Sequence, residues 1–222
     1  MTIRERVLVG VSRQLGRPTG VVGRVVGRAF NPGNRSVILA AVEAVEVRKG
    51  CTVAEVGFGG GAGPALLLDQ DGPSGVVHGI EIAPTMLAAA RRHFENQVTM
   101  GSLHLHEATM QLLLLPDGSV DAAISTNTIY FVDDLGAAMS ELARVLRPGG
   151  RLALGVGDPA AMTKMPFTKH GFTLRPVSEI IESLRLAGFT LIEDRRVGDG
   201  PDAFHVLACE RAPSRPGSTL CE

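Results

Sequence analysis

The feature that most constrains the fold is a glycine-rich turn between a short apolar strand and a helix. Residues 52–56 read Thr-Val-Ala-Glu-Val, a pattern typical of a buried strand, and glycines then stand at every second position from Gly57 to Gly63. Pro64 follows, where the first turn of a helix tolerates a residue without a backbone N–H. Glycines in this context let the backbone turn sharply and approach a ligand closely. The turn therefore predicts a ligand site at the carboxyl ends of a parallel sheet.

Strand patterns alternate with helical patterns over most of the chain, which is typical of a parallel α/β sheet. Strands are expected at residues 52–56, 76–80, 103–106, 120–125, 152–156, 190–197 and 203–210. One helix is expected to stop at Pro148-Gly149-Gly150, and Ser178 is expected to cap another helix that ends at Gly188. The pattern predicts one main domain.

We divide the chain into three parts. Residues 1–34 form an N-terminal helical extension, residues 35–211 form the main domain, and residues 212–222 form a flexible tail rich in Pro, Ser and Gly. The extension is interpreted as a lid over the substrate cleft or as a surface for a homodimer. A membrane-surface helix is the less favoured interpretation, because the apolar stretch at 21–30 is short.

Composition excludes several classes of partner. The net charge is -1 and aromatic residues make up 4% of the 222 residues, with no Trp, which argues against nucleic acid as a partner. No apolar run approaches the length of a bilayer span, so no membrane partner is expected. Three cysteines without metal-ligand spacing favour reduced thiols, and we expect a cytoplasmic location.

Two carboxylates identify the kind of ligand. Glu55 precedes the first glycine, where it suits a ligand with an ammonium group and would repel a pyrophosphate. Glu81 stands 20 residues after Gly61, where a carboxylate can accept both hydroxyls of a ribose. No Lys-Ser/Thr pair follows the glycines, which disfavours nucleotide hydrolysis. S-adenosylmethionine has the required ribose and cationic amine and needs no phosphate site.

Four segments stand in order within residues 35–210. They are Glu55-x-Gly57-x-Gly59-x-Gly61, Gly79-Ile80-Glu81-Ile82-Ala83-Pro84-Thr85-Met86, Leu115-Pro116-Asp117-Gly118-Ser119-Val120-Asp121-Ala122 and Leu142-x-x-Val145-Leu146-Arg147-Pro148-Gly149-Gly150. Together they resemble the class I S-adenosylmethionine-dependent methyltransferases, in particular the methyltransferase type 11 group. The fold class expected is α/β: a Rossmann-like, doubly wound seven-stranded sheet, mostly parallel with an antiparallel last strand, plus the N-terminal helical extension.

The resemblance implies S-adenosyl-L-methionine as cofactor, with S-adenosyl-L-homocysteine as product. The cofactor-binding residues that it implies are Glu55, Gly57, Gly59, Gly61, Glu81, Ile82, Met86, Thr109, Met110 and Asn127. The family commonly has Gly-Asp-Ala after the third strand, where this chain reads Ala108-Thr109-Met110. The Thr109 hydroxyl then takes the place of the Asp that contacts adenine, and Glu107 is the alternative in a shifted register.

Two residues are candidates for catalysis. Tyr130 follows the fourth strand and is interpreted as orienting an acceptor; the alternative is that it packs against the next helix. His170 lies in the connection after the fifth strand and is a general-base candidate, because imidazole titrates near working pH; the alternative is a surface or capping histidine. His104 and His106 alternate along one strand without a third ligand, so no metal is expected.

The predicted function is in-line transfer of a methyl group to a small-molecule acceptor. The acceptor atom is oxygen, nitrogen or an activated carbon, and a natural product or secondary metabolite is among the acceptors considered. Two alternatives stay open at this point. One is a non-catalytic protein that binds S-adenosylmethionine, and the other is an NAD(P)-dependent oxidoreductase on a related fold.

Overall fold

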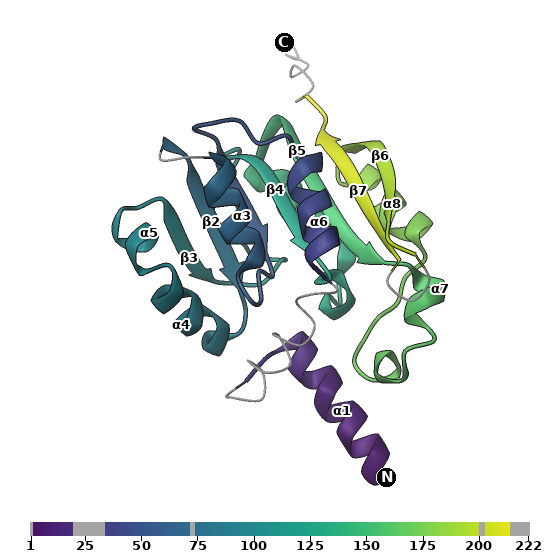
Figure 1. The fold of residues 1–222 in the computed structure, drawn as a ribbon. Coiled ribbons are helices and arrows are strands. Elements are labelled where there is room, and N and C mark those ends of the chain that lie inside the picture. The colour runs from purple at the N-terminus through teal and green to yellow at the C-terminus, as the bar shows by residue number, and fades with distance from the viewer. Residues whose placement is uncertain (1, 20–33, 72–73, 200–202, 214–222) are drawn as a thin grey trace, which may run out of the picture.

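Seven strands form one sheet in the order β3-β2-β1-β4-β5-β7-β6 (Figure 1). The computed structural model describes residues 2–19, 34–71, 74–199 and 203–213. The strands are β1 (Thr52–Val56), β2 (Val76–Glu81), β3 (Leu103–Glu107), β4 (Val120–Thr126), β5 (Leu146–Gly157), β6 (Phe189–Val197) and β7 (Phe204–Arg211). Strands β1 to β5 pair in parallel, whereas β7 pairs antiparallel with both β5 and β6. The predicted fold class is confirmed.

The strand order places a switch point beside β1. The chain runs outward from β1 through β2 to β3, and then returns to the other side of β1 to form β4 and β5. In such sheets the connections after the two strands at the switch point diverge, and a crevice opens at their carboxyl ends. The glycine-rich turn follows β1, so it lies at this crevice.

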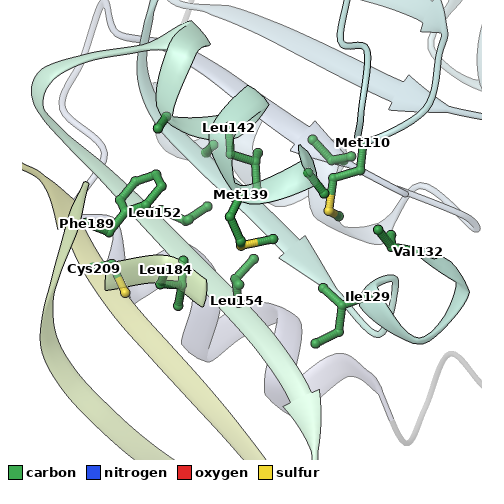
Figure 2. Close-up of a cluster of buried hydrophobic side chains, with 14 of the residues drawn as sticks. Met110, Ile129, Val132, Met139, Leu142, Leu152, Leu154, Leu184, Phe189 and Cys209 are labelled. Carbon is green, nitrogen blue, oxygen red and sulfur yellow. The ribbon is translucent and has the colours of Figure 1, made fainter. Parts of the chain in front are cut away.

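Helices cover both faces of the sheet and bury two separate cores. The α-helices of the described segments, those beyond the sheet faces included, are α1 (Ile3–Gly16), the helix of residues 34–44, α3 (Ala62–Asp71), α4 (Pro84–His93), α5 (Glu95–Thr99), α6 (Leu135–Val145), α7 (Pro159–Met162) and α8 (Val177–Leu186). Met139 and Leu142 of α6 and Leu184 of α8 pack on one face, as Figure 2 shows. Val37 of the helix at 34–44 and Leu87 of α4 belong to the core of the opposite face. The sheet is therefore doubly wound.

Helix α1 stands beyond the carboxyl ends of the parallel strands, apart from both helical layers (Figure 1). Its start is fixed by a capping box in which Thr2 accepts from the Glu5 N–H and the Glu5 carboxylate accepts from the Thr2 N–H. The second apolar stretch of the extension, residues 21–30, lies outside the described residues. The division into extension, domain and tail stays a prediction. Among the described helices, none has the length and apolar character that a bilayer span requires.

Two predicted boundaries are wrong. The Pro148-Gly149-Gly150 segment does not end a helix: α6 ends at Val145 and β5 already begins at Leu146. A register shift between Val120 and Ala122 of β4 leaves this part of β5 irregularly paired, which is where a strand accepts proline. Ser178 does not cap α8, because Pro176 precedes a helix that starts at Val177. Gly188 does follow the helix end, with a φ of 90°.

We expect Leu142→Ala to lower the free energy of unfolding by ~2–5 kcal/mol, because Leu142 is fully buried in the core under α6 and its truncation leaves a cavity. Leu186→Ala is the control, since Leu186 is exposed on α8, and should change stability by less than ~0.5 kcal/mol. Urea denaturation followed by circular dichroism measures both. Equal losses in the two variants would contradict the packing described.

Candidate functional site

A cavity of about 900 Å³ opens at the carboxyl ends of β1, β2 and β4. Its walls come from segments far apart in the sequence. They are residues 9–18, 55–60, 81–86, 108–111, 126–133, 157–173 and 203–204 together with Asn34 and Ile38. Of the twelve residues predicted for the site, eleven line this cavity and Gly61 does not. The site lies where the glycine-rich turn predicted it.

The glycines of the turn play different structural roles. Gly57 has a φ of 79° and donates its N–H to the Ile80 carbonyl at 2.8 Å, and a Cβ there would lie 2.2 Å from Thr128 Oγ1. Gly59 has a φ of 50°, and a Cβ there would meet no atom within 4 Å. Gly61 faces the ring of Phe94 instead of the cavity. Gly57 therefore permits close packing, whereas Gly59 leaves open space against the backbone in the cavity wall.

Glu81 ties the turn to the neighbouring strand. Its Oε2 accepts from the Gly59 N–H and its Oε1 accepts from the Ala83 N–H, both at 2.9 Å. Burial raises the pKa of the carboxyl, and the backbone N–H groups that it accepts from oppose that rise. Each carboxylate oxygen keeps a lone pair for a further donor. Glu81 is thus held in place and still able to accept hydrogen bonds from a ligand.

Glu55 is buried without a partner for one of its oxygens. The side chain is 2% exposed, and Oε2 accepts no hydrogen bond from the described residues. The carboxyl lies against Gly63 at the start of α3, where both oxygens would be within 2.3 Å of an added Cβ. Burial, and then the charge of Glu81, raise the pKa of Glu55 to about 8. A cationic ligand group would satisfy this oxygen and favour the ionised carboxylate.

A chain of hydrogen bonds crosses the cavity wall beside β4. Asn127 has a φ of 56°; its Nδ2 donates to Asn34 Oδ1 at 3.0 Å, and its Oδ1 accepts from the Tyr130 hydroxyl at 3.3 Å. The Gly157 N–H in turn donates to the Tyr130 oxygen. Burial raises the pKa of Tyr130 to about 12, so its phenol stays neutral. The chain fixes the Asn127 amide between the helix of residues 34–44 and the end of β5.

Aromatic rings form the wall around His170. Phe172 lies 4.7 Å from Phe131, 5.6 Å from Tyr130 and 5.8 Å from Phe167, between ring centroids. His170 follows η3 (Pro166–Lys169) and lines the cavity next to these rings. Sequence reasoning named Tyr130 and His170 but gave no role to Phe131, Phe167 or Phe172. An apolar stretch at 160–172 was the available signal.

Helix α1 packs over this aromatic wall. The Ser12 hydroxyl donates to the His170 carbonyl, and Gly16 sits so close to Phe131 that an added Cβ would lie 2.7 Å from the ring. These two contacts place the last turn of α1 in the cavity wall. The lid interpretation of the extension is consistent with this arrangement for the described residues 2–19.

The remaining predicted residues surround the end of β2. Ile82, Met86, Thr109 and Met110 all line the cavity. Thr109 is exposed and forms an isolated bridge with Leu112, whereas the Met110 side chain is buried. Together they form a pocket beside Glu81 that is apolar except for the Thr109 hydroxyl. A flat ring bound next to a ribose would be accommodated by such a pocket.

Three histidines cluster on strands β2 and β3, away from the cavity lining. His78 Nδ1 lies 3.0 Å from His106 Nε2, and the ring of His78 stacks on that of His104. Burial lowers the pKa of His78 to about 4. Within the described segments, no group of three His, Cys, Asp or Glu residues is placed to hold a metal ion.

Comparison with known proteins identifies the domain. Residues 54–154 match the methyltransferase domain family. This match makes residues 54–154 similar to the methyltransferase domains of the type 11 group, as the sequence resemblance predicts. Over 148 residues the chain is 30% identical to an O-methyltransferase from Pyrenophora dematioidea, and the aligned region covers 64% of this chain and 55% of that protein. It is 34% identical over 106 residues to a ubiquinone/menaquinone biosynthesis C-methyltransferase from Pasteurella multocida, covering 48% and 40%.

A solved structure supports the same assignment for the fold. A SAM-dependent methyltransferase from Aquifex aeolicus superposes with a TM-score of 0.70 at 20% identity, covering 83% of this chain and 96% of that one. The chain spans about half of the length of the two curated relatives. The predicted resemblance is confirmed for residues 54–154, and S-adenosylmethionine stays the cofactor that this resemblance implies.

The residues of this site fit that cofactor. The orphaned Oε2 of Glu55 is a buried acceptor suited to an ammonium group, and the space beside Gly59 leaves room for a ligand against the backbone. Glu81 offers two fixed carboxylate oxygens for hydroxyl donors. The cavity lining combines these three features with the pocket beside β2.

We expect the buried carboxyl of Glu55 to make the ligand-free protein less stable at high pH. Its folded pKa of about 8 lies above the ordinary 4.5, so the stability from the protonated form is present below about pH 4.5 and is lost as the pH rises through about 8. The loss is on the order of a few kcal/mol. In Glu55→Gln this loss should disappear, whereas the exposed control Glu95→Gln should keep it.

Urea denaturation across that pH range measures the effect. Other titrating groups, such as His78, are present in all three proteins, so the difference between wild type and Glu55→Gln isolates Glu55. Parallel stability curves for these two proteins would show that Glu55 is ionised in the folded chain.

Proposed function

We propose that this chain transfers the methyl group of S-adenosylmethionine to a small-molecule acceptor with a hydrophobic body. The observation that carries the proposal is that one cavity joins the turn with its two buried carboxylates to a chamber walled by aromatic rings. The two curated relatives are named for oxygen and for carbon acceptors, so the family alone leaves the acceptor atom open.

The cofactor half of the cavity is formed by residues after β1 and β2. In this proposal Glu55 binds the ammonium group, Glu81 accepts the ribose hydroxyls, and Ile82, Met86, Thr109 and Met110 surround the adenine. Gly57 and Gly59 present the backbone of the turn, and Gly61 supports that backbone from behind. Asn127, held by Asn34 and Tyr130, binds the amino-acid end of the cofactor. When bound, the cofactor supplies a methyl group on a positively charged sulfur.

The acceptor half lies between α1 and the segment that contains His170. Here the protein orients the acceptor and excludes water, which are the two contributions that speed a displacement between bound reactants. The aromatic wall and α1 provide both. Tyr130, with its hydroxyl between Asn127 and Gly157, acts by positioning Asn127.

His170 takes the proton from an acceptor hydroxyl in this proposal. It is the histidine of the described chain that lines the cavity, and its main chain is fixed by Ser12 of α1. A general base contributes typically about 10²–10⁴-fold to a rate when the nucleophile must lose a proton. An amine or an activated carbon acceptor would need only positioning.

The location and assembly of the protein remain part of the proposal. The Cys209 thiol is buried in the core and its pKa is raised by burial to about 12, which keeps it as an unreactive thiol. Such thiol usage supports a cytoplasmic location. A homodimer stays a prediction.

Gly59→Arg is expected to abolish binding of S-adenosylhomocysteine without unfolding the chain. An arginine there would extend into the open space beside the backbone, at a cost of roughly 1–2 kcal/mol for the left-handed conformation. Calorimetry measures the binding and circular dichroism measures the fold. Gly101→Arg is the control, because Gly101 also has a positive φ with open space but lies outside the cavity lining. Unchanged affinity for S-adenosylhomocysteine in Gly59→Arg would show that the cofactor does not bind beside Gly59.

His170→Gln is expected to lower the rate of methyl transfer to a hydroxyl acceptor by about 10²-fold or more while leaving the affinity for S-adenosylhomocysteine unchanged. His93→Gln is the control, since His93 is at the end of α4 and outside the cavity lining. The measurement is the initial rate with radiolabelled cofactor, as a function of pH. If the variant keeps the wild-type pH profile, His170 is not the general base. If the wild-type chain binds the cofactor but methylates none of a broad set of acceptors, it is a binding protein and not an enzyme.

A further inference from the structure

The end of α1 brings two exposed arginines to the cavity, Arg13 in its last turn and Arg17 directly after it. Arg13 and Arg17 both belong to its lining. Neither guanidinium forms an ion pair or a hydrogen bond with any residue in the segments that the structure describes. Each follows a residue that contacts the aromatic wall: Ser12 donates to the His170 carbonyl, and Gly16 packs on Phe131. The two cations therefore border the acceptor half of the cavity.

The carboxylates of the lining do not neutralise this pair. Glu55 and Glu81 lie at the ends of β1 and β2, where Glu81 is bound by backbone N–H groups. Asp133 is the remaining carboxylate in the described lining; it is exposed and pairs with neither arginine. The rings of Phe131, Phe167 and Phe172 form an apolar wall in the acceptor half, beside the uncharged polar side chains of Gln14 and Thr173.

Arg13 and Arg17 carry like charges at the same end of α1, and like charges that lie near each other repel. The negative end of the helix dipole favours cations in the last turn, and this explains why arginine is tolerated there. It does not account for two guanidinium groups that both border a cavity. An anion bound between them would remove the repulsion, and the guanidinium fork matches the oxygens of a carboxylate or a phosphate in two parallel hydrogen bonds.

We propose that the methyl acceptor is an amphipathic anion. Its hydrophobic body packs against the aromatic wall, and its carboxylate or phosphate group binds Arg13 and Arg17 of α1. Helix α1 is then the specificity element of the site. This inference rests on the proposed function, because it assigns the substrate class of the same cavity.

The test uses the full chain saturated with S-adenosylhomocysteine and four probes that share a phenylbutyl body. These are 4-phenylbutyrate, 4-phenylbutyl phosphate, the neutral 4-phenylbutanol and the cationic 4-phenylbutylamine. The proteins are wild type, the double variant Arg13→Gln/Arg17→Gln, and Arg6→Gln. Arg6 is exposed on the same helix and outside the cavity lining, so it is the matched control. Calorimetry gives each dissociation constant, at low and at high salt.

Wild type and Arg6→Gln should bind the better of the two anions about ten-fold more tightly than the alcohol, and the amine least. The double variant should lose this preference, bind the alcohol as wild type does, and keep its affinity for S-adenosylhomocysteine. The anion that binds wild type more tightly shows whether the anionic group of the acceptor is a carboxylate or a phosphate. Equal binding of anions and alcohol by wild type, failure of all four probes to bind, or a preference that survives in the double variant overturns the proposal. Failure of wild type to bind S-adenosylhomocysteine would instead refute the proposed function.

Discussion

The site depends on the hydrogen bonds that the Glu81 carboxylate accepts. This carboxylate joins the end of β2 to the turn after β1 through Gly59, and to the start of α4 through Ala83. Without these acceptors, the buried Ala83 N–H and the half-buried Gly59 N–H would lose their partners. An unpaired N–H that is fully buried costs about 1–3 kcal/mol. The same carboxylate then presents its remaining lone pairs to a ligand. One side chain thus shapes the turn and forms part of the binding surface.

Placing Glu55 beside Glu81 carries an electrostatic cost that a cationic ligand relieves. Each carboxyl is buried, and the charge of Glu81 adds to the burial that raises the pKa of Glu55. A ligand with an ammonium group pairs with the orphaned oxygen and makes the ionised form favourable. The proposed cofactor and its demethylated product share this ammonium group, so in this proposal Glu55 contributes to binding both and does not distinguish them.

The sequence predicted most of the sheet and the cofactor half of the cavity, because local patterns carry that information. Apolar runs indicate the strands, Gly57 and Gly59 directly follow β1, and Glu81 is the last residue of β2. Other contacts in the cavity wall join residues far apart in the sequence: Ser12 and His170 are 158 residues apart, and Asn34 and Asn127 are 93 apart. No local pattern encodes such pairs. The helix end expected at Pro148 was wrong for a similar reason, because the irregular pairing of β5 with β4, and not a local pattern, sets where β5 begins.

The segments that border the proposed acceptor lie largely outside the part of the chain that matches the family. The family match covers residues 54–154, which hold the glycine-rich turn, both buried carboxylates and the strand ends that line the cofactor half of the cavity. The His170 segment, the Phe167 and Phe172 rings, and α1 with Arg13 and Arg17 lie outside that range. The relatives that match part of this chain are named for different acceptors. In the proposed function the matched part binds the methyl donor, so we infer that the segments outside it contribute to the choice of acceptor. In this chain those segments combine aromatic rings with two arginines.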